Sequence, residues 1–267
     1  MMGAESLQVE RYLTRLGIER RPPPTVEGIG SLMTAHLVAV PFENLDVYWQ
    51  RGVSVDVEGS VSKIVDAGRG GWCFELNGAF AWLLQQLGFD LRLLGAAVLL
   101  GGPNRVIDHM ALEVTIQGRP HLVDVGFGDG FTSPLPLNVG GDQVLNGGND
   151  RFGLIPGAEG TTLVRYRDVV PEAQFRFRRV SLAIDDFGPA SQRLYADPDG
   201  NFRQGPVVSR LLGHGPDRVT LTTDRLRLVR GGRTIDVAVE GGSRAWFDHL
   251  RNWFGIDGAA LRRPRSG

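Results

Sequence analysis

The residues GRGGWCFELNGAFAWLLQQLG, at 68–88, join a glycine-rich turn to a segment that is apolar on nearly every side. A helix of this kind is typical of a protein interior, and we expect residues 73–87 to form one. Gly70 and Gly71 lead the chain into it, and Cys73 falls in its first turn. The sequence before and after this helix should therefore supply the layers that cover it.

Three further helices are predicted ahead of this segment. Apolar residues recur at helical spacing from 9 to 16. Thr25 is a suitable cap for a second helix that ends at Pro41, because the residue before a proline disfavours helical geometry. A third helix fits 60–67, with Ser60 as its cap.

After Gly88 the pattern changes to apolar runs and alternations that are typical of strands. The predicted strands cover residues 91–100, 109–116, 119–126, 161–169, 174–183, 218–230 and 233–240. Tight turns are expected at Gln117-Gly118 and Gly231-Gly232. A final helix fits 243–254, whereas 184–217 has no clear pattern. Helices, then strands, then a terminal helix indicate an α+β fold.

The composition restricts the classes of partner. Of 267 residues, 42% are hydrophobic and 22% charged, which argues against wholesale disorder. The net charge of -1 gives no basic field for nucleic acid. No apolar run approaches the ~20 residues of a membrane span, and a single cysteine fits a reducing compartment. We therefore expect a cytoplasmic protein with neither a nucleic-acid nor a membrane partner.

Lys63 is the only lysine among 29 basic residues, the other 28 being arginine. We attribute this excess of arginine to coding bias, and we infer no phosphate site from it.

Cys73 is the leading candidate for chemistry. Unpaired N–H groups and the dipole at a helix start favour the thiolate, which is the nucleophilic form of cysteine. The alternative is a buried structural thiol, which most lone cysteines are. A nucleophilic cysteine needs a base, and the base needs a group that orients it. His109 opens a predicted strand and Asp124 lies near the end of the next, so a hairpin would make them neighbours.

Other polar residues are interpreted as structural. These are the remaining histidines, His36, His121, His214 and His249. Glu75 and Asn77 are expected to form local hydrogen bonds at the start of the buried helix. No set of histidine, cysteine and acidic residues has the spacing of a zinc site, and we expect no metal. The GDG at 128–130 lacks the strand–helix setting of a dinucleotide site.

Four motifs in order resemble the arylamine N-acetyltransferase family. They are PFENLDV (41–47), RGGWCFELNG (69–78), DHM (108–110) and VDVGFG (123–128). The resemblance runs from residue 9 to about 140 and then fades into a general match of length and hydrophobic pattern.

The resemblance implies a helical bundle, a β-barrel and an α/β lid around a Cys–His–Asp core like that of cysteine proteases. The expected division is 1–88 for the helical domain with the nucleophile, 89–185 for the barrel with His and Asp, and 186–267 for the lid. By the family pattern, Cys73 is the nucleophile, His109 its base and Asp124 the orienting carboxylate.

The resemblance also suggests substrate contacts. Phe42 and Phe127 match aromatic positions of the family's acceptor pocket, with core packing as the alternative, and Gly128 is a further candidate. The turn at 126–128, together with the N–H of Cys73, is a candidate oxyanion hole.

Two weaker assignments complete this comparison. Arg69 and Glu43 are expected to pair as structural support beneath the catalytic loop. Residues 101–106 match only weakly a loop near coenzyme A, so the residues that bind coenzyme A stay unassigned.

The expected activity is ping-pong transfer of an acetyl group from acetyl-CoA, through Cys73, to an arylamine or a hydrazine. Acetyl-CoA is then a cosubstrate, and no metal or prosthetic group is implied. The alternative within the family is an amide synthase that closes a polyketide thioester onto an aryl amine to form a macrolactam.

Overall fold

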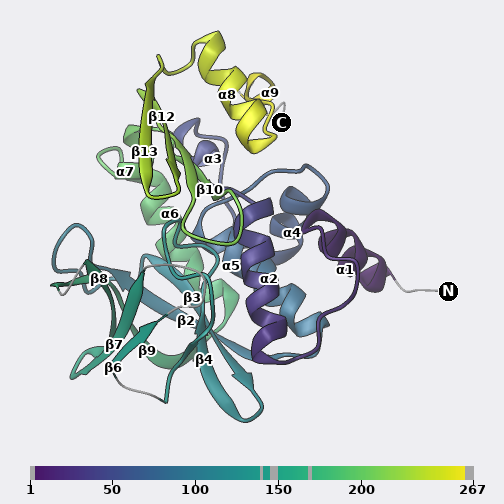
Figure 1. Ribbon diagram of the computed structural model, residues 1–267, viewed down its shortest axis with the longest axis vertical. Coiled ribbons are helices and arrows are strands. Elements are labelled where there is room, and N and C mark those ends of the chain that lie inside the picture. The colour runs from purple at the N-terminus through teal and green to yellow at the C-terminus, as the bar shows by residue number, and fades with distance from the viewer. Residues whose placement is uncertain (1–3, 139–140, 145–149, 168–169, 262–267) are drawn as a thin grey trace.

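The computed structural model describes residues 4–138, 141–144, 150–167 and 170–261. N-terminal helices, a large sheet and a smaller C-terminal sheet make up the molecule (Figure 1). The helices are α1 (Ala4–Arg15), α2 (Val26–Ala39), α3 (Leu45–Tyr48), α4 (Val57–Val65), α5 (Cys73–Gln86), the 3-10 helix η1 (Ile184–Phe187), α6 (Gly188–Ala196), α7 (Asn201–Gln204), α8 (Arg244–Phe254) and α9 (Gly258–Leu261). The strands are β1 (Phe42–Glu43), β2 (Asp90–Val98), β3 (His109–Ile116), β4 (Arg119–Val123), β5 (Leu135–Pro136), β6 (Gly141–Val144), β7 (Arg151–Gly157), β8 (Gly160–Arg167), β9 (Val170–Leu182), β10 (Val208–Leu211), β11 (Arg218–Leu221), β12 (Arg225–Arg230) and β13 (Arg233–Ala238).

Helix α5 lies in the interior, as its apolar sequence predicts. Phe80, Leu83 and Leu84 are fully buried, and α5 packs against α4 on one side and against β2 and β3 on another. Figure 1 shows α1, α2 and α4 gathered beside it, away from the large sheet. The first turn of α5 therefore sits where the helices meet the sheet.

The large sheet is antiparallel, with strand order β5-β4-β3-β2-β9-β8-β7-β6. The predicted β-barrel is only a half-barrel, because β5 and β6 form the two edges of this order and the curled sheet does not close. Register shifts between Leu94 and Ala96 in β2, and between Leu163 and Val164 in β8, interrupt regular pairing. Such bulges bend a sheet locally without closing it.

The smaller sheet has the order β1-β10-β11-β12-β13, and α8 covers it. Its edge strand β1 comes from the helical part of the chain and pairs with β10. The predicted single strand 218–230 is wrong: a turn at 222–224 splits it into β11 and β12, which pair as a hairpin. This turn lets both halves join one sheet.

Other differences from the sequence predictions are local. Helix α4 begins at Val57 rather than near Ser60, because the carboxylate of Asp56 caps it by accepting from the N–H of Gly59. The cap by Thr25 is confirmed, since its hydroxyl accepts from Gly28 N–H at 3.1 Å. The unclear stretch 184–217 holds η1, α6, α7 and β10. The division at 88 and 185 stays a prediction.

Candidate active site

Cys73 is the first residue of α5, as predicted, and it is only 5% exposed. Its Sγ lies 3.9 Å from the carbonyl oxygen of Asp108. An N–H in the first turn of a helix has no acceptor in a preceding turn, so the positive end of the helix dipole lies at this sulfur. The position suits a thiolate.

The glycine pair before Cys73 is required by close packing. A Cβ on Gly70 would overlap the carbonyl oxygen of Pro41, and one on Gly71 would lie 2.6 Å from Oε2 of Glu75. That same Oε2 accepts the N–H of Trp72 at 3.2 Å. The glycine pair thus allows the chain to turn sharply into α5.

His109 and Asp124 are neighbours, as the predicted hairpin requires. Strands β3 and β4 pair in antiparallel register from Leu112 opposite Val123, which leaves His109 at the start of β3 near the residue that follows β4. Nε2 of His109 lies 2.6 Å from Oδ2 of Asp124, and both side chains are almost fully buried.

The environment of His109 favours its charged form. Burial opposes the imidazolium, but the Asp124 carboxylate and the neighbouring Cys73 outweigh this and raise the pKa of His109 to about 10. Because Asp124 holds Nε2, Nδ1 is the ring nitrogen left to face Cys73. The imidazolium therefore lies between two groups that are stabilised by its charge.

Asn77 joins the first turns of α5 to this pair. Its Nδ2 donates to Oδ1 of Asp124 at 2.8 Å and to the carbonyl of Met110 at 2.6 Å. Its Oδ1 accepts the N–H of Val125 at 2.9 Å. The expectation of a purely local role for Asn77 is wrong, because these partners come from β3 and from the segment after β4.

The turn after Asp124 rests directly on α5. A Cβ on Gly126 would lie 2.7 Å from Nδ2 of Asn77 and 2.8 Å from Cα of Cys73, so only glycine fits. The N–H of Gly126 donates to Oδ1 of Asp124 at 2.8 Å. The predicted oxyanion hole therefore loses this donor, because the carboxylate already uses it.

Two aromatic side chains pack on the imidazole. Phe127 meets His109 edge-on with ring centroids 5.2 Å apart, and Phe175 lies 5.1 Å from His109. The role of Phe175 was missed in the sequence, because it comes from β9 and reaches the site only through the strand order of the sheet. These rings limit the access of water to the imidazole.

The other predicted contact residues, Phe42 and Gly128, lie against each other. Gly128 has a φ of +85°, and a Cβ there would lie 3.7 Å from the ring of Phe42. The ring centroid of Phe42 in turn lies 6.1 Å from that of Phe202 in α7. Phe202 is a second residue that no sequence pattern predicts at the site.

A cleft of about 1080 Å³ opens onto Cys73 and His109. Phe42, Phe127, Gly128 and Phe202 line it. Four arginines from both sheets line it as well: Arg165, Arg218, Arg225 and Arg227. The cleft therefore has an aromatic part near the sulfur and a charged part, in which aspartates pair with Arg165, Arg218 and Arg227.

The two other aspartates closest in sequence to the pair, Asp108 and Asp129, have other partners. Asp108 accepts from the N–H of Val98 at 2.8 Å and from Nδ2 of Asn104 at 2.6 Å. It thereby ties the weakly matched loop 101–106 to the end of β2. Asp129 pairs with Arg165 at 2.9 Å. Asp124 is thus the carboxylate bound to His109.

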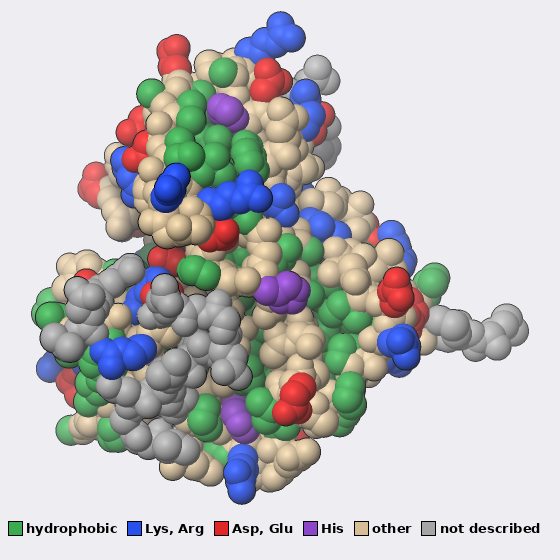
Figure 2. Space-filling model, viewed as in Figure 1, with side chains coloured by type: hydrophobic (Ala, Val, Ile, Leu, Met, Phe, Trp, Pro, Cys, Tyr) green, Lys and Arg blue, Asp and Glu red, His purple; other side chains and the backbone are tan. Residues whose placement is uncertain are grey.

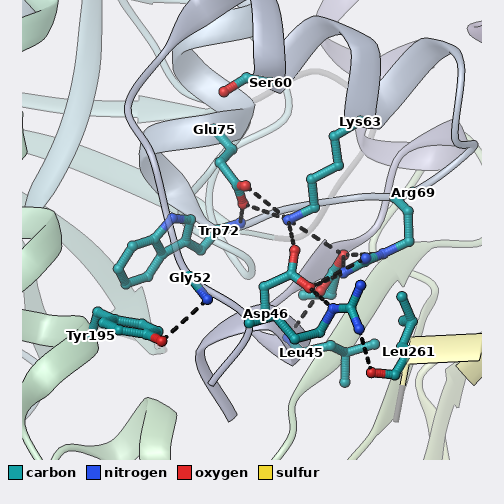
Figure 3. Close-up of polar contacts among 12 residues, drawn as sticks. Leu45, Asp46, Gly52, Ser60, Lys63, Arg69, Trp72, Glu75, Tyr195 and Leu261 are labelled. Atoms are coloured by element: carbon teal, nitrogen blue, oxygen red, sulfur yellow. Dashed lines mark hydrogen bonds and ion pairs between the residues drawn. The ribbon is translucent and has the colours of Figure 1, made fainter. Parts of the chain in front are cut away.

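The predicted ion pair beneath the loop is confirmed. Nη2 of Arg69 lies 2.6 Å from Oε1 of Glu43. Lys63 joins this pair although no sequence pattern predicts it: its Nζ lies 2.8 Å from both Oε1 of Glu75 and Oδ2 of Asp46 (Figure 3). The sequence reading of Glu75 as a local hydrogen-bonding residue was therefore incomplete.

Of the remaining histidines, His36 has the clearest structural role. It is fully buried and lies 3.0 Å from the hydroxyl of Tyr12, and burial lowers its pKa to about 3. Within 4–138, 141–144, 150–167 and 170–261, no three histidine, cysteine or acidic side chains could hold a metal ion together. In the same part of the chain, no helix has the length and apolar character needed to span a membrane.

Comparisons with known proteins cover most of the chain. A family model described as N-acetyltransferase matches residues 25–260. The arylamine N-acetyltransferase / N-hydroxyarylamine O-acetyltransferase of Salmonella typhimurium is 30% identical over 257 residues, which cover 92% of this chain and 87% of that protein.

Solved structures agree with the sequence match. The arylamine N-acetyltransferase from Salmonella typhimurium superposes with a TM-score of 0.88 at 27% identity, covering 98% of this chain and 99% of that one. The Mycobacterium marinum arylamine N-acetyltransferase in complex with CoA gives a TM-score of 0.85 at 29% identity, covering 95% and 94%. With the family model and these relatives both spanning nearly its full length, the chain belongs to the arylamine N-acetyltransferase family.

Proposed function

We propose that this protein transfers an acetyl group from acetyl-CoA to an arylamine or a hydrazine through an acetyl-Cys73 intermediate. One observation carries the proposal: the buried His109–Asp124 pair, at 2.6 Å, lies beside a cysteine at a helix start, at the head of a large cleft. Membership of the family supports the reaction class, and acyl transfer through cysteine requires this set of groups.

The first half of the reaction loads the enzyme. The Cys73 thiolate attacks the carbonyl carbon of the acetyl thioester, and the bond from that carbon to the sulfur of coenzyme A breaks. The leaving thiolate takes the proton from Nδ1 of His109. Asp124 stabilises the imidazolium before this step and fixes the ring so that Nδ1 points at the sulfur.

The second half releases the product. The amine nitrogen attacks the acetyl carbon on Cys73, neutral His109 accepts the proton from that nitrogen, and the Cys73 thiolate leaves. Arylamines and hydrazines are weakly basic, so they are largely neutral near pH 7 and have a free electron pair. The cycle ends with the thiolate and the imidazolium restored.

The developing oxyanion needs N–H donors. The N–H of Cys73 is our first candidate, because a helix start leaves it without an intrahelical acceptor. The N–H groups of Phe127 and Gly128 remain candidates, whereas Gly126 is excluded by its bond to Asp124.

The two parts of the cleft suggest where the substrates bind. The rings of Phe42 and Phe127 suit a flat aromatic acceptor near the sulfur. Arg225 lines the same cleft, and its guanidinium suits a phosphate of coenzyme A, because arginine binds phosphate through paired hydrogen bonds. Arg227 is less suited, since it already donates two hydrogen bonds of 2.8 Å to the carboxylate of Asp236. The alternative activity, an amide synthase that forms a macrolactam, has no support among the similar proteins.

Mass spectrometry tests the proposal directly. The protein is mixed with acetyl-CoA, and we expect a gain of about 42 Da, one acetyl group in place of a hydrogen, as for an acyl-enzyme. The chain has one cysteine, so Cys73→Ser is a complete control and should gain nothing and lose nearly all turnover. Retention of more than about a tenth of the wild-type rate in Cys73→Ser would exclude covalent catalysis through this residue. No mass gain in the wild type would exclude acetyl-CoA as the donor.

A further inference from the structure

Lys63 occupies an unusual position for its residue type. The chain has arginine at the other 28 basic positions. At 63, in α4, it has lysine, next to the loop of residues 66–72 that leads to Cys73. The Nζ of Lys63 lies 2.8 and 2.9 Å from the two carboxylate oxygens of Glu75 and 2.8 Å from Oδ2 of Asp46 (Figure 3). Its side chain is 13% exposed.

The geometry explains why lysine is needed. An ammonium group is compact and has three donors that point in different directions, which matches two carboxylates approaching from different elements, α5 and α3. A guanidinium is a larger planar fork that matches one carboxylate edge-on. Arg69 is mainly of this kind: two of its nitrogens donate to Oε1 of Glu43 at 2.9 and 2.6 Å, and its contact with Oδ1 of Asp46 is longer, at 3.4 Å.

Lys63 connects the elements that hold Cys73. Glu75 accepts a hydrogen bond from the N–H of Trp72 at the start of α5. Asp46 also pairs with Arg51, whose Nε lies 3.1 Å from Oδ1 of Asp46. The backbone N–H of Arg69 donates to the carbonyl of Lys63 at 3.1 Å. The ammonium of Lys63 therefore links α4 to α3 and to the first turn of α5, and the backbone carbonyl of the same residue holds the loop through Arg69.

We propose that Lys63 is a positioning residue for acetyl transfer: it clamps the start of α5 and cancels the negative charge that Glu75 would otherwise place in the same helical turn as Cys73. The proposal rests on the proposed role of Cys73 as the nucleophile. Three acidic and three basic side chains face one another in this cluster: Glu43, Asp46, Glu75, Lys63, Arg69 and Arg51. Removing the lysine leaves an excess negative charge near the sulfur whenever Glu75 is ionised.

Burial raises the pKa of Glu75, an effect that Lys63 opposes and that Glu43 and Asp46 reinforce. The groups that face Cys73 from the other side are His109, with Asp124 behind it, and the carbonyl of Asp108. These stay unchanged when Lys63 is replaced, so a change in the reactivity of Cys73 reports on the cluster.

The test compares four proteins: wild type, Lys63→Met, Lys63→Met/Glu75→Gln and the control Arg11→Met. Arg11 forms an exposed pair with Asp66 on α4's C-terminal side, so its loss removes a nearby basic residue without touching the loop. Glutamine at 75 keeps an oxygen for the N–H of Trp72 but removes the charge. The rate of acetyl uptake from acetyl-CoA and the pH profile of Cys73 alkylation are measured well below each melting temperature.

We expect Lys63→Met to take up acetyl at least about tenfold more slowly. Its alkylation profile should move up at pH values where Glu75 is ionised, by at most about one pH unit, the order of effect that a unit charge on the order of 10 Å from a thiol produces in a protein. The shift is bounded because Glu75 without Lys63 also takes up a proton more readily. The double variant should recover the wild-type profile, and Arg11→Met should match wild type. A lower melting temperature with unchanged rate and profile would show a merely structural role and overturn the proposal.

Two further outcomes are informative. If Lys63→Met does not fold, Glu75→Gln alone carries the test: its excess positive charge should move the alkylation profile to lower pH, and an unmoved profile overturns the proposal. If wild type takes up no acetyl group, the proposed function fails instead. Alkylation of Cys73 would still decide the effect of Lys63.

Discussion

Two buried polar clusters flank the first turns of α5, and they differ in the partners that their carboxylates have. On one side, Asp124 faces the imidazole of His109. On the other, Glu75 faces the ammonium of Lys63. Asn77 and Glu75, two residues apart, point to opposite sides because each helical residue turns by about 100°.

The difference separates reactivity from support. Imidazole can give up and regain a proton during a reaction, whereas lysine and arginine remain charged throughout the neutral range. Burial opposes the charge of Lys63, but Glu75, Glu43 and Asp46 outweigh burial and hold its pKa above the usual range. The first cluster is therefore suited to moving protons, and the second to holding the loop.

The largest expected effect comes from Asp124→Asn. The donors Asn77 and Gly126 N–H will keep the asparagine oxygen, so its NH₂ group faces Nε2 of His109. The proton of neutral imidazole must then sit on Nδ1, which can no longer accept one from the amine. We expect turnover to fall by about 10³–10⁴-fold, as for loss of the orienting carboxylate in a serine triad.

The matched control is Asp108→Asn, whose side chain binds Val98 and Asn104. It should keep turnover within about tenfold of wild type. Asparagine keeps an oxygen for the N–H of Val98 and gives up only the hydrogen bond from Asn104, and the loss of one hydrogen bond costs about 1 kcal/mol. Circular dichroism checks that both variants fold. Unchanged turnover and Cys73 alkylation in Asp124→Asn would make Asp124 a structural residue and break the comparison.

The second prediction concerns the supporting cluster. Arg69→Met leaves Glu43, whose side chain is fully buried, without its closest cation. Removing one partner of a buried ion pair costs about 3–5 kcal/mol of unfolding free energy. Urea unfolding should show that loss, whereas the double variant Glu43→Gln/Arg69→Met should regain part of it. Equal losses for Arg69→Met and the exposed-pair variant Arg11→Met, expected below about 1 kcal/mol, would contradict the prediction.

The sequence predicts the residues of the first cluster better than those of the second. Cys73, His109 and Asp124 lie in motifs whose local structure is simple: a helix start and the two ends of one hairpin. Lys63 and Asp46 carry no such signal, because their contact depends on how α4 packs against α3. Charge pairing between separate helices has no period that a sequence pattern can show.

The same distinction explains the errors in the fold. Phe175 reaches His109 because β9 pairs with β2, although 66 residues separate it from the histidine. The sequence pattern does not predict strands β6 and β7. It also does not predict the break at 222–224, because the residues on both sides of that break keep strand-like composition. Sheet closure likewise depends on bulges and edge pairing, which emerge only when strands from distant parts of the chain meet.

The last prediction is a pH dependence of stability that belongs to the first cluster. The pKa of His109 is raised to about 10 in the folded protein, against about 6.5 in an unfolded chain. Below about pH 6.5 both states hold the proton, and the stabilisation by Asp124 is fully present. Above it the folded state binds more protons than the unfolded state, so stability falls as the pH rises toward 10.

Melting temperatures of wild type and Asp124→Asn, measured from pH 6 to pH 9.5, isolate this contribution. The lysine and arginine cluster is the same in both proteins, so any slope it adds cancels in the difference. Because asparagine offers no charge to the imidazolium, the wild type should lose about 2–4 °C more than the variant over this range for each kcal/mol involved. Parallel curves would mean that the imidazolium is not stabilised by Asp124, and the contrast between a proton-responsive cluster and a fixed one would then fail.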